Sequence, residues 1–158
     1  MIKFVKVRRL KLNSDKMVRA IENALTGAAH AAKIDFDVTT QTWKNRPQFI
    51  IQTFPGRRIV STDNLIYLFI DKGTKRHPID AVRSPFLIFQ WGGPGSYQAK
   101  TTPRVIASRP GGPTGPVVMT THVDHPGTEA RNFAETIKDK WDRELPEIMQ
   151  RAIDAEMQ

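Results

Sequence analysis

The chain has 158 residues, of which 39% are apolar and 25% charged, a composition typical of a globular protein rather than a disordered one. The absence of cysteine excludes disulfide scaffolds, thiol nucleophiles and cysteine-based zinc sites. Every apolar run is shorter than the roughly 18–20 residues of a membrane span, and the N-terminus lacks the apolar core of a secretory signal. We therefore expect one soluble domain over residues 1–158, made in the cytoplasm, with no membrane partner.

Charge is unevenly distributed around the net value of +8. Residues 129–157 carry eight acidic side chains against five basic ones, so this segment is −3 and the rest of the chain is +11. The first eleven residues hold five bases and no acid. A basic body suits nucleic acid, an acidic membrane surface or an acidic protein neighbour, and charge alone does not choose among them.

The N-terminal part of the chain predicts a strand, a helix and a second strand. A short strand is expected over residues 1–12, and a helix over about 14–32, where apolar residues recur at helical spacing. The strict alternation of residues 34–39 predicts a half-buried strand. Asp35 and Asp37 are expected on its solvated face.

The middle of the chain predicts a hairpin and a short helix. Residues 48–61 are two apolar segments separated by Pro55 and Gly56, the pattern of a hairpin. Residues 64–70 are apolar and follow Asp63, which is expected to cap a short helix.

A long loop rich in glycine and proline interrupts the next pair of strands. Residues 86–91 predict a buried strand, and residues 117–123 predict another that pairs with it. Between them, residues 92–116 hold six glycines and five prolines. A loop of this length inside a compact domain is usually functional or disordered. We expect it to be the tip of a long hairpin.

The last segment predicts an amphipathic helix that Thr128 caps. Its apolar stripe consists of Phe133, Ile137, Trp141, Leu145, Ile148 and Ala152. Pro146 predicts a kink or a break near residues 144–146. The expected fold class is α+β: an antiparallel, mostly meandering sheet with the N-terminal and C-terminal helices packed on one side.

Motifs for chemistry are weak. The best metal candidate is His122 with Asp124 and His125, which share a strand end and suit zinc or another divalent ion. The competing interpretation is that these histidines bond backbone groups at a corner, and no fourth ligand is evident. No G-x-S-x-G nucleophile motif occurs, and the glycines of residues 92–95 lack the Walker lysine–serine pair. We expect neither catalysis nor a cofactor.

A nucleic-acid-binding accessory protein is the second hypothesis, because basic residues are abundant and several aromatic residues are available for base stacking. These are Phe4, Trp43, Phe54 and Trp91. No recognition helix, zinc finger or RNP-type motif accompanies them.

Three stretches carry a more specific signal: residues 62–74, 100–108 and 125–133. The first ends in a D-x-G-T motif, and the third spells H-P-G-x-x-A-R-x-F at the start of the final helix. Their order, together with the glycine- and proline-rich loop, resembles the tail-completion proteins of long-tailed bacteriophages, also called neck or head–tail joining proteins. The resemblance covers about residues 10–150.

The resemblance implies a mechanical function. Proteins of this family form a ring, typically a hexamer, between the head connector or stopper protein and the tail tube protein. The ring completes the tail and lets it dock onto a filled head, and genomic DNA passes through the lumen without specific recognition. The implied location is the head–tail interface of the virion, with assembly in the host cytoplasm.

The motif residues also make physical sense as turns. Gly73 supplies a positive φ and Thr74 bonds the turn after Asp71. A rigid and then permissive corner, followed by a helix cap, accounts for the second motif. The residues expected to define these turns are Asp71, Gly73, Thr74, Pro126, Gly127 and Thr128.

Residues 92–116 are the expected docking loop, since a mobile loop that orders on a neighbouring subunit locks a ring at low cost. Tyrosine and arginine are enriched at binding hot spots. The expected interface residues are Tyr97, Lys100, Arg104, Arg109 and Arg131. Arg131 is expected to reach back to the Asp71 turn or across a subunit boundary. The competing interpretation is a disordered surface loop without a partner.

Overall fold

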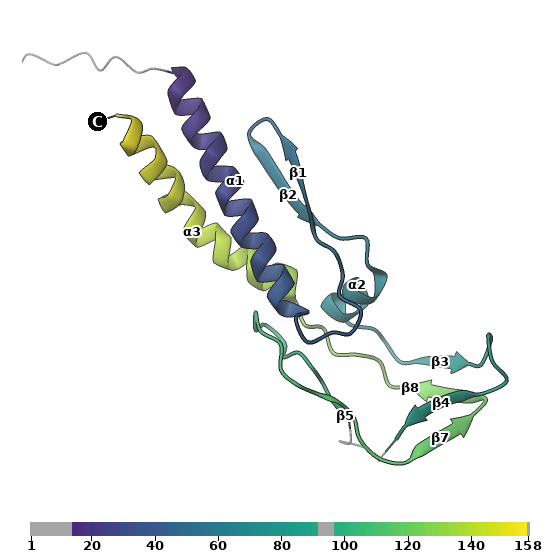
Figure 1. Ribbon diagram of the computed structural model, residues 1–158. Coiled ribbons are helices and arrows are strands. Elements are labelled where there is room, and N and C mark those ends of the chain that lie inside the picture. The colour runs from purple at the N-terminus through teal and green to yellow at the C-terminus, as the bar shows by residue number, and fades with distance from the viewer. Residues whose placement is uncertain (1–13, 92–96, 158) are drawn as a thin grey trace, which may run out of the picture.

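The computed structural model describes residues 14–91 and 97–157, so the strand expected over residues 1–12 lies outside the described part. The described chain contains three helices and four antiparallel strand pairs, which confirms the α+β class. The strands form separate two-stranded pairs rather than one meandering sheet. The long helices α1 (Ser14–Thr39) and α3 (Phe133–Glu156) pack against each other in opposite directions, and strand pairs extend from their lower end (Figure 1).

Helix α1 continues through residues 34–39, so the strand expected there is wrong. A short period-two pattern does not separate a strand from one face of a helix, and tertiary contacts select the helix. Asp35 accepts hydrogen bonds from Lys140 Nζ at 2.7 Å and Trp141 Nε1 at 2.9 Å, so it joins α1 to α3 instead of facing solvent. Phe36 packs against the aromatic core.

The expected hairpin is confirmed as β1 (Ile50–Phe54) and β2 (Arg57–Ser61). It turns at Gly56, whose φ is +65°. The hairpin lies along α1 (Figure 1). A helix follows it as expected, α2 (Leu65–Lys72), but the capping side chain is Asn64 rather than Asp63.

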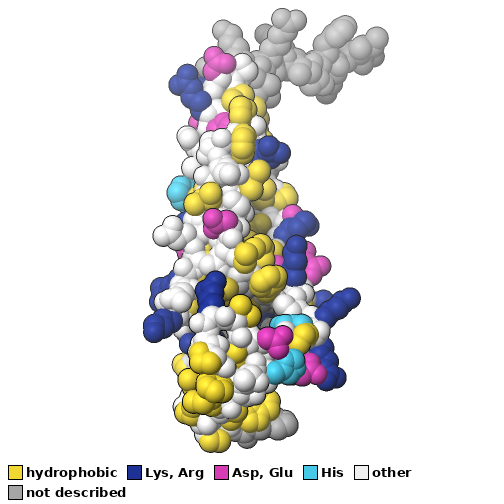
Figure 2. Space-filling model, turned by 90° about the vertical axis from the view of Figure 1, so that its right-hand side faces the viewer, with side chains coloured by type: hydrophobic (Ala, Val, Ile, Leu, Met, Phe, Trp, Pro, Cys, Tyr) yellow, Lys and Arg dark blue, Asp and Glu magenta, His cyan; other side chains and the backbone are white. Residues whose placement is uncertain are grey.

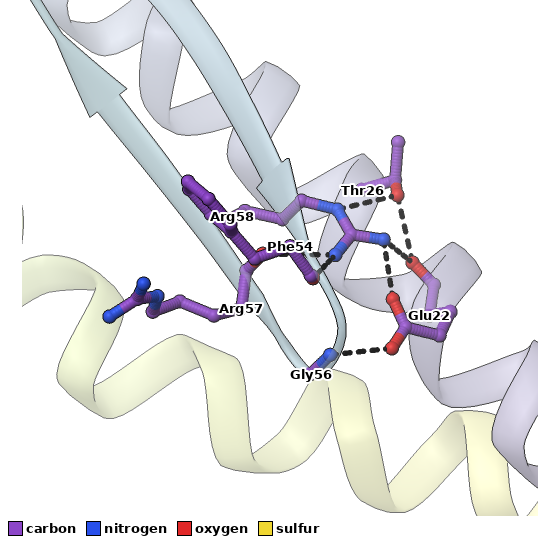
Figure 3. Close-up of polar contacts among 6 residues, drawn as sticks. All are labelled: Glu22, Thr26, Phe54, Gly56, Arg57 and Arg58. Atoms are coloured by element: carbon purple, nitrogen blue, oxygen red, sulfur yellow. Dashed lines mark hydrogen bonds and ion pairs between the residues drawn. The ribbon is translucent and has the colours of Figure 1, made fainter.

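A polar contact fastens the hairpin to α1. Arg58 Nη2 lies 2.5 Å from Glu22 Oε2, and Arg58 Nε donates to Thr26 Oγ1 at 3.1 Å (Figure 3). The other oxygen of Glu22 accepts from the backbone N–H of Gly56 at 2.7 Å. The side chain of Glu22 therefore holds the turn of the hairpin as well as its second strand.

This contact predicts a pH-dependent stability. The Gly56 N–H, and then Arg58, hold the pKa of Glu22 below its ordinary value of 4.5. A carboxylate with a lowered folded pKa stabilises the fold above the unfolded pKa, and this contribution is lost as pH falls through the folded pKa. Glu22→Gln should lower the urea midpoint at pH 7, and the difference from wild type should shrink towards pH 3. A difference that stays constant with pH would contradict this, and Glu156→Gln, at an exposed position, is the control.

Helix α3 begins at Phe133, with Asn132 at its N-cap in the left-handed region and without a capping side-chain bond. The cap expected from Thr128 is therefore wrong. The helix is continuous through Pro146, so the expected break near residues 144–146 is wrong, and the expected kink stays a prediction. The proline leaves the carbonyl of Asp142 without its helical partner, and Asp142 is exposed to water. Within residues 14–91 and 97–157, no helix is both long and apolar enough for a membrane span.

The remaining strands form one interrupted ladder, which we call the arm (residues 74–91 and 97–128). Its pairs follow one another between the bridges Thr74–Thr128 and Thr101–Ser108. The arm leaves the lower end of the helices and turns back towards them (Figure 1). Its strands are β3 (His77–Asp80), β4 (Leu87–Gln90), β5 (Tyr97–Gln98), β6 (Gly112–Pro113), β7 (Val117–Thr120) and β8 (His122–His125).

The pairing of β4 with β7 confirms the expected long hairpin. The expectation that residues 86–91 are buried is wrong, because β4 alternates between half-buried and exposed side chains. The directly opposed pair Ile88 and Met119 is 62% and 60% exposed. A ribbon of only two strands has no third layer to cover both of its faces.

The buried core is small and aromatic. The core consists of Phe49, which precedes β1, Tyr67 of α2 and Phe133 at the start of α3. The three side chains meet at the lower end of the helices. Tyr67 contacts Phe49 edge-on at 5.0 Å and stacks on Phe133 at 5.9 Å between ring centroids. Burial raises the pKa of the Tyr67 phenol. The partly buried residues around them are Phe36, Trp43, Val60 and Ile70.

Candidate functional site

The two turn motifs of the sequence lie against each other, at a junction that we call the corner (residues 71–74 and 126–132). Thr74 N donates to Thr128 O at 2.9 Å, and Thr128 N donates back to Thr74 O at 3.1 Å. This pair of bonds starts the ladder of the arm. Pro126 is exposed beside it. The corner therefore joins both strands of the arm to α2 and α3.

Two glycines permit the close approach of the corner's two segments. Gly73 has φ +73°, and a Cβ there would lie 2.6 Å from Thr128 O and 2.8 Å from Ala130 N. Gly127 has φ +96°, and a Cβ there would overlap Thr74 O. Each position therefore needs glycine for two reasons: its own turn has a positive φ, and a Cβ would clash with the backbone of the opposite motif.

Asp71 links the corner to the start of α3. Its buried carboxylate accepts a hydrogen bond from Ala134 N at 3.1 Å, and its carbonyl accepts from Arg131 N and Asn132 N. The unpaired N–H groups at the start of a helix need such acceptors. The cap of α3 therefore comes from α2, which frees Thr128 for the ladder. Sequence reasoning placed Asp71 in a turn and missed this capping role.

The tip of the arm (residues 99–110) is bound to other parts of the same chain. Ser108 Oγ donates to Val38 O at 3.1 Å and to Thr39 O at the end of α1. The backbone N–H of Arg104, at φ +57°, donates to Arg131 O at 2.8 Å. The described part of the glycine- and proline-rich loop is thus folded back onto the helices and the corner. Its contact with a neighbouring subunit stays a prediction.

The expected interface residues fall into two groups. Lys100 is half-buried, with Nζ 3.4 Å from Thr42 O, and Tyr97 lies in β5 opposite a proline of β6. Arg104 is exposed at the tip. Arg109 and Arg131 line one cavity of about 560 Å³ between the tip and the corner. Of the alternatives for Arg131, its backbone reaches the Asp71 turn, and its guanidinium contacts Glu129 at 3.2 Å.

Exposed apolar side chains gather on the arm and on α2. Figure 2 shows them covering much of the end of the molecule that the arm forms. Those of the arm are Ile79, Val82, Phe86, Ile88, Trp91, Val105, Val117 and Met119, and those of α2 are Leu65, Ile66 and Phe69. Apolar patches on this scale mark interaction surfaces in soluble proteins.

The residues of the metal hypothesis have other partners. His122 Nδ1 lies 2.6 Å from a carboxylate oxygen of Asp80, and Asp124 accepts from Arg76. That bond holds the pKa of Asp124 below its usual range. His125 Nδ1 accepts from the backbone N–H of residue 127. In the described part of the chain, no three metal-ligating side chains converge.

Comparison of the chain with protein-family models, with curated proteins and with solved structures found no match.

Proposed function

We propose that this protein is a structural subunit of the neck of a long-tailed bacteriophage. It assembles into a ring, hexameric as in the family that its sequence resembles, which completes the tail and joins it to the filled head. The ring contacts the head connector or stopper protein and the tail tube protein, and genomic DNA passes through its lumen without specific recognition. This role needs neither catalysis nor a cofactor.

The observation that carries the self-assembly in this proposal is the apolar surface of the arm and α2, and the neck assignment rests on the sequence resemblance of residues 62–74, 100–108 and 125–133. A two-stranded ribbon with Ile88 and Met119 on one face is at best marginally stable alone in water. The core of the described chain is small and does not cover the ribbon. A partner that covers the ribbon therefore stabilises the folded subunit. A contact between the arm of one copy and α2 of the next is heterologous, and heterologous contacts form a ring where the rotation between copies closes.

The direct test is electron microscopy of phage particles produced without this gene. Filled heads and free tails side by side are the expected result. Overlong tails would instead assign the protein to termination of tube growth. Normal infectious particles would overturn the neck proposal.

The apolar ribbon itself predicts the outcome of a double substitution. Ile88→Ser with Met119→Ser should weaken self-association on the order of 100-fold, because about 3 kcal/mol of apolar burial is lost. Light scattering after size-exclusion chromatography measures the oligomer. Ile34→Ser, at an exposed apolar position on α1, is the matched control and should leave association unchanged. Equal oligomers in all three proteins would contradict the proposed interface.

The nucleic-acid hypothesis rests on the net charge of +8. A binder of duplex DNA should show high affinity that falls steeply as salt rises. A subunit that only surrounds DNA should bind it weakly at physiological salt. A salt titration of the wild-type protein against duplex DNA separates the two roles.

A further inference from the structure

The cavity between the tip of the arm and the corner contains two arginines from distant parts of the chain. Arg109 follows the Thr101–Ser108 bridge on the returning side of the tip, and Arg131 precedes α3. Thr101, which is buried, and Glu129 also line the cavity. The folding back of the arm therefore creates a concave site with a positive wall.

Arg131 is fixed in place but incompletely paired. Its side chain is only 11% exposed, and its Nε is buried without a hydrogen-bond partner among the described residues. Its ion-pair partner is Glu129, which is 75% exposed, at 3.2 Å. Its backbone is held on both sides, by the carbonyls of α2 and by the N–H of Arg104. A buried cation with one solvated partner is costly, and a second carboxylate would offset that cost.

Arg109 supplies the second cation. Its backbone N–H donates to Lys100 O at 2.8 Å and its Nε donates to Ala99 O at 3.3 Å, so the side chain is held against the outgoing segment of the tip. Within residues 14–91 and 97–157, no acidic side chain forms an ion pair with it at 4.0 Å or less. Guanidinium groups bind carboxylates with two parallel hydrogen bonds, so this pair suits an oxyanion of that shape.

We propose that this cavity binds a carboxylate side chain of a second copy of the chain, supplied by the outer part of α3 (residues 144–156). This inference rests on the self-assembly in the proposed function. Residues 129–157 carry a net charge of −3 against +11 elsewhere. Glu144 and Glu147 are exposed there, and neither forms an ion pair within the described chain. The outer part of α3 points away from the arm, so the same copy cannot fill its own cavity (Figure 1).

A carboxylate fits this site better than a DNA strand does. Single-stranded or duplex DNA needs a basic track longer than one concave site, and this cavity offers two arginines beside Glu129. The acidic side chain of a neighbouring subunit requires only a local cation pair. This arrangement also makes the contact heterologous, with the cavity of one copy facing α3 of the next.

Charge reversal tests the inference. Arg109→Glu should weaken self-association of the full chain at least tenfold, measured by sedimentation velocity. Arg57→Glu, at another exposed arginine, which lies in the hairpin, is the matched control and should associate as wild type does (Figure 3). Arg109→Gln removes the charge without adding a repulsive one and should give a smaller loss in the same direction.

A charge swap separates recognition from a general loss of structure. Glu147→Arg or Glu144→Arg alone should weaken association. The variant that weakens it should restore association when it is combined with Arg109→Glu. Wild-type association in Arg109→Glu, or failure of both swaps, would overturn the cavity's role while leaving ring assembly intact. A monomeric wild type would overturn both proposals. Loss of duplex DNA binding in Arg109→Glu with unchanged association would assign the cavity to phosphate instead.

Discussion

Alanine at position 73 or 127 is expected to lower the free energy of unfolding by about 2–6 kcal/mol. The positive φ of each glycine costs an L-residue roughly 1–3 kcal/mol, and at Gly73 the ψ of 170° lies in a region essentially restricted to glycine. Overpacking typically adds about 1–3 kcal/mol. At Gly73 the added Cβ would lie 2.6 Å from Thr128 O, and at Gly127 it would overlap Thr74 O. Because these atoms form the first rung of the arm, the corner must open to admit the methyl group.

Gly56→Ala is the matched control for this prediction. Gly56 has a similar φ of +65°, but a Cβ there meets nothing within 4 Å. Its substitution should therefore show only the conformational cost, about 1–2 kcal/mol. Urea denaturation followed by circular dichroism measures all three variants. Equal losses at positions 56, 73 and 127 would show that the close approach of the two motifs carries no energy.

Phe133→Ala is expected to cost about 3–5 kcal/mol of stability, the range typical of a fully buried phenylalanine. Phe133 is 0% exposed and stacks on Tyr67 at the junction of α2 and α3. The core around it is small, so neighbouring side chains cannot collapse into the cavity without separating the helices. Thermal or urea unfolding measures the loss.

Phe69→Ala provides the comparison, because Phe69 lies on α2 and is 56% exposed. It should cost less than about 1 kcal/mol of stability, as is usual for surface substitutions. Similar losses for Phe69 and Phe133 would contradict the assignment of the core. Weaker self-association of Phe69→Ala without a stability change would support α2 as part of the assembly surface.

The elements that depend on local chemistry could be predicted from the sequence. The turn at Gly56 defines the β1–β2 hairpin, and apolar spacing defines α3 and the first part of α1. The pairing of β4 with β7 also follows from two apolar segments around a loop rich in glycine and proline. In each case the signal lies within a few residues of the element that it specifies.

Contacts between distant residues decided what the sequence did not predict. Residues 34–39 are helical because Asp35 bonds to Lys140 and Trp141, about a hundred positions away. Local capping preference predicts Thr128 as the cap of α3, whereas Asp71 supplies it across 63 positions. The fold-back of the tip depends on Ser108 and the end of α1, which no local pattern connects.

The sequence alone determined that Gly73 and Gly127 sit at turns, since backbone freedom is a property of the residue itself. Tertiary structure decided that these turns touch, because a close approach depends on the partner as well as on the glycine. It also decided that Arg109 and Arg131 share one cavity. Local conformational preference is encoded residue by residue, whereas a site assembled from distant residues exists only once packing has brought their backbones together.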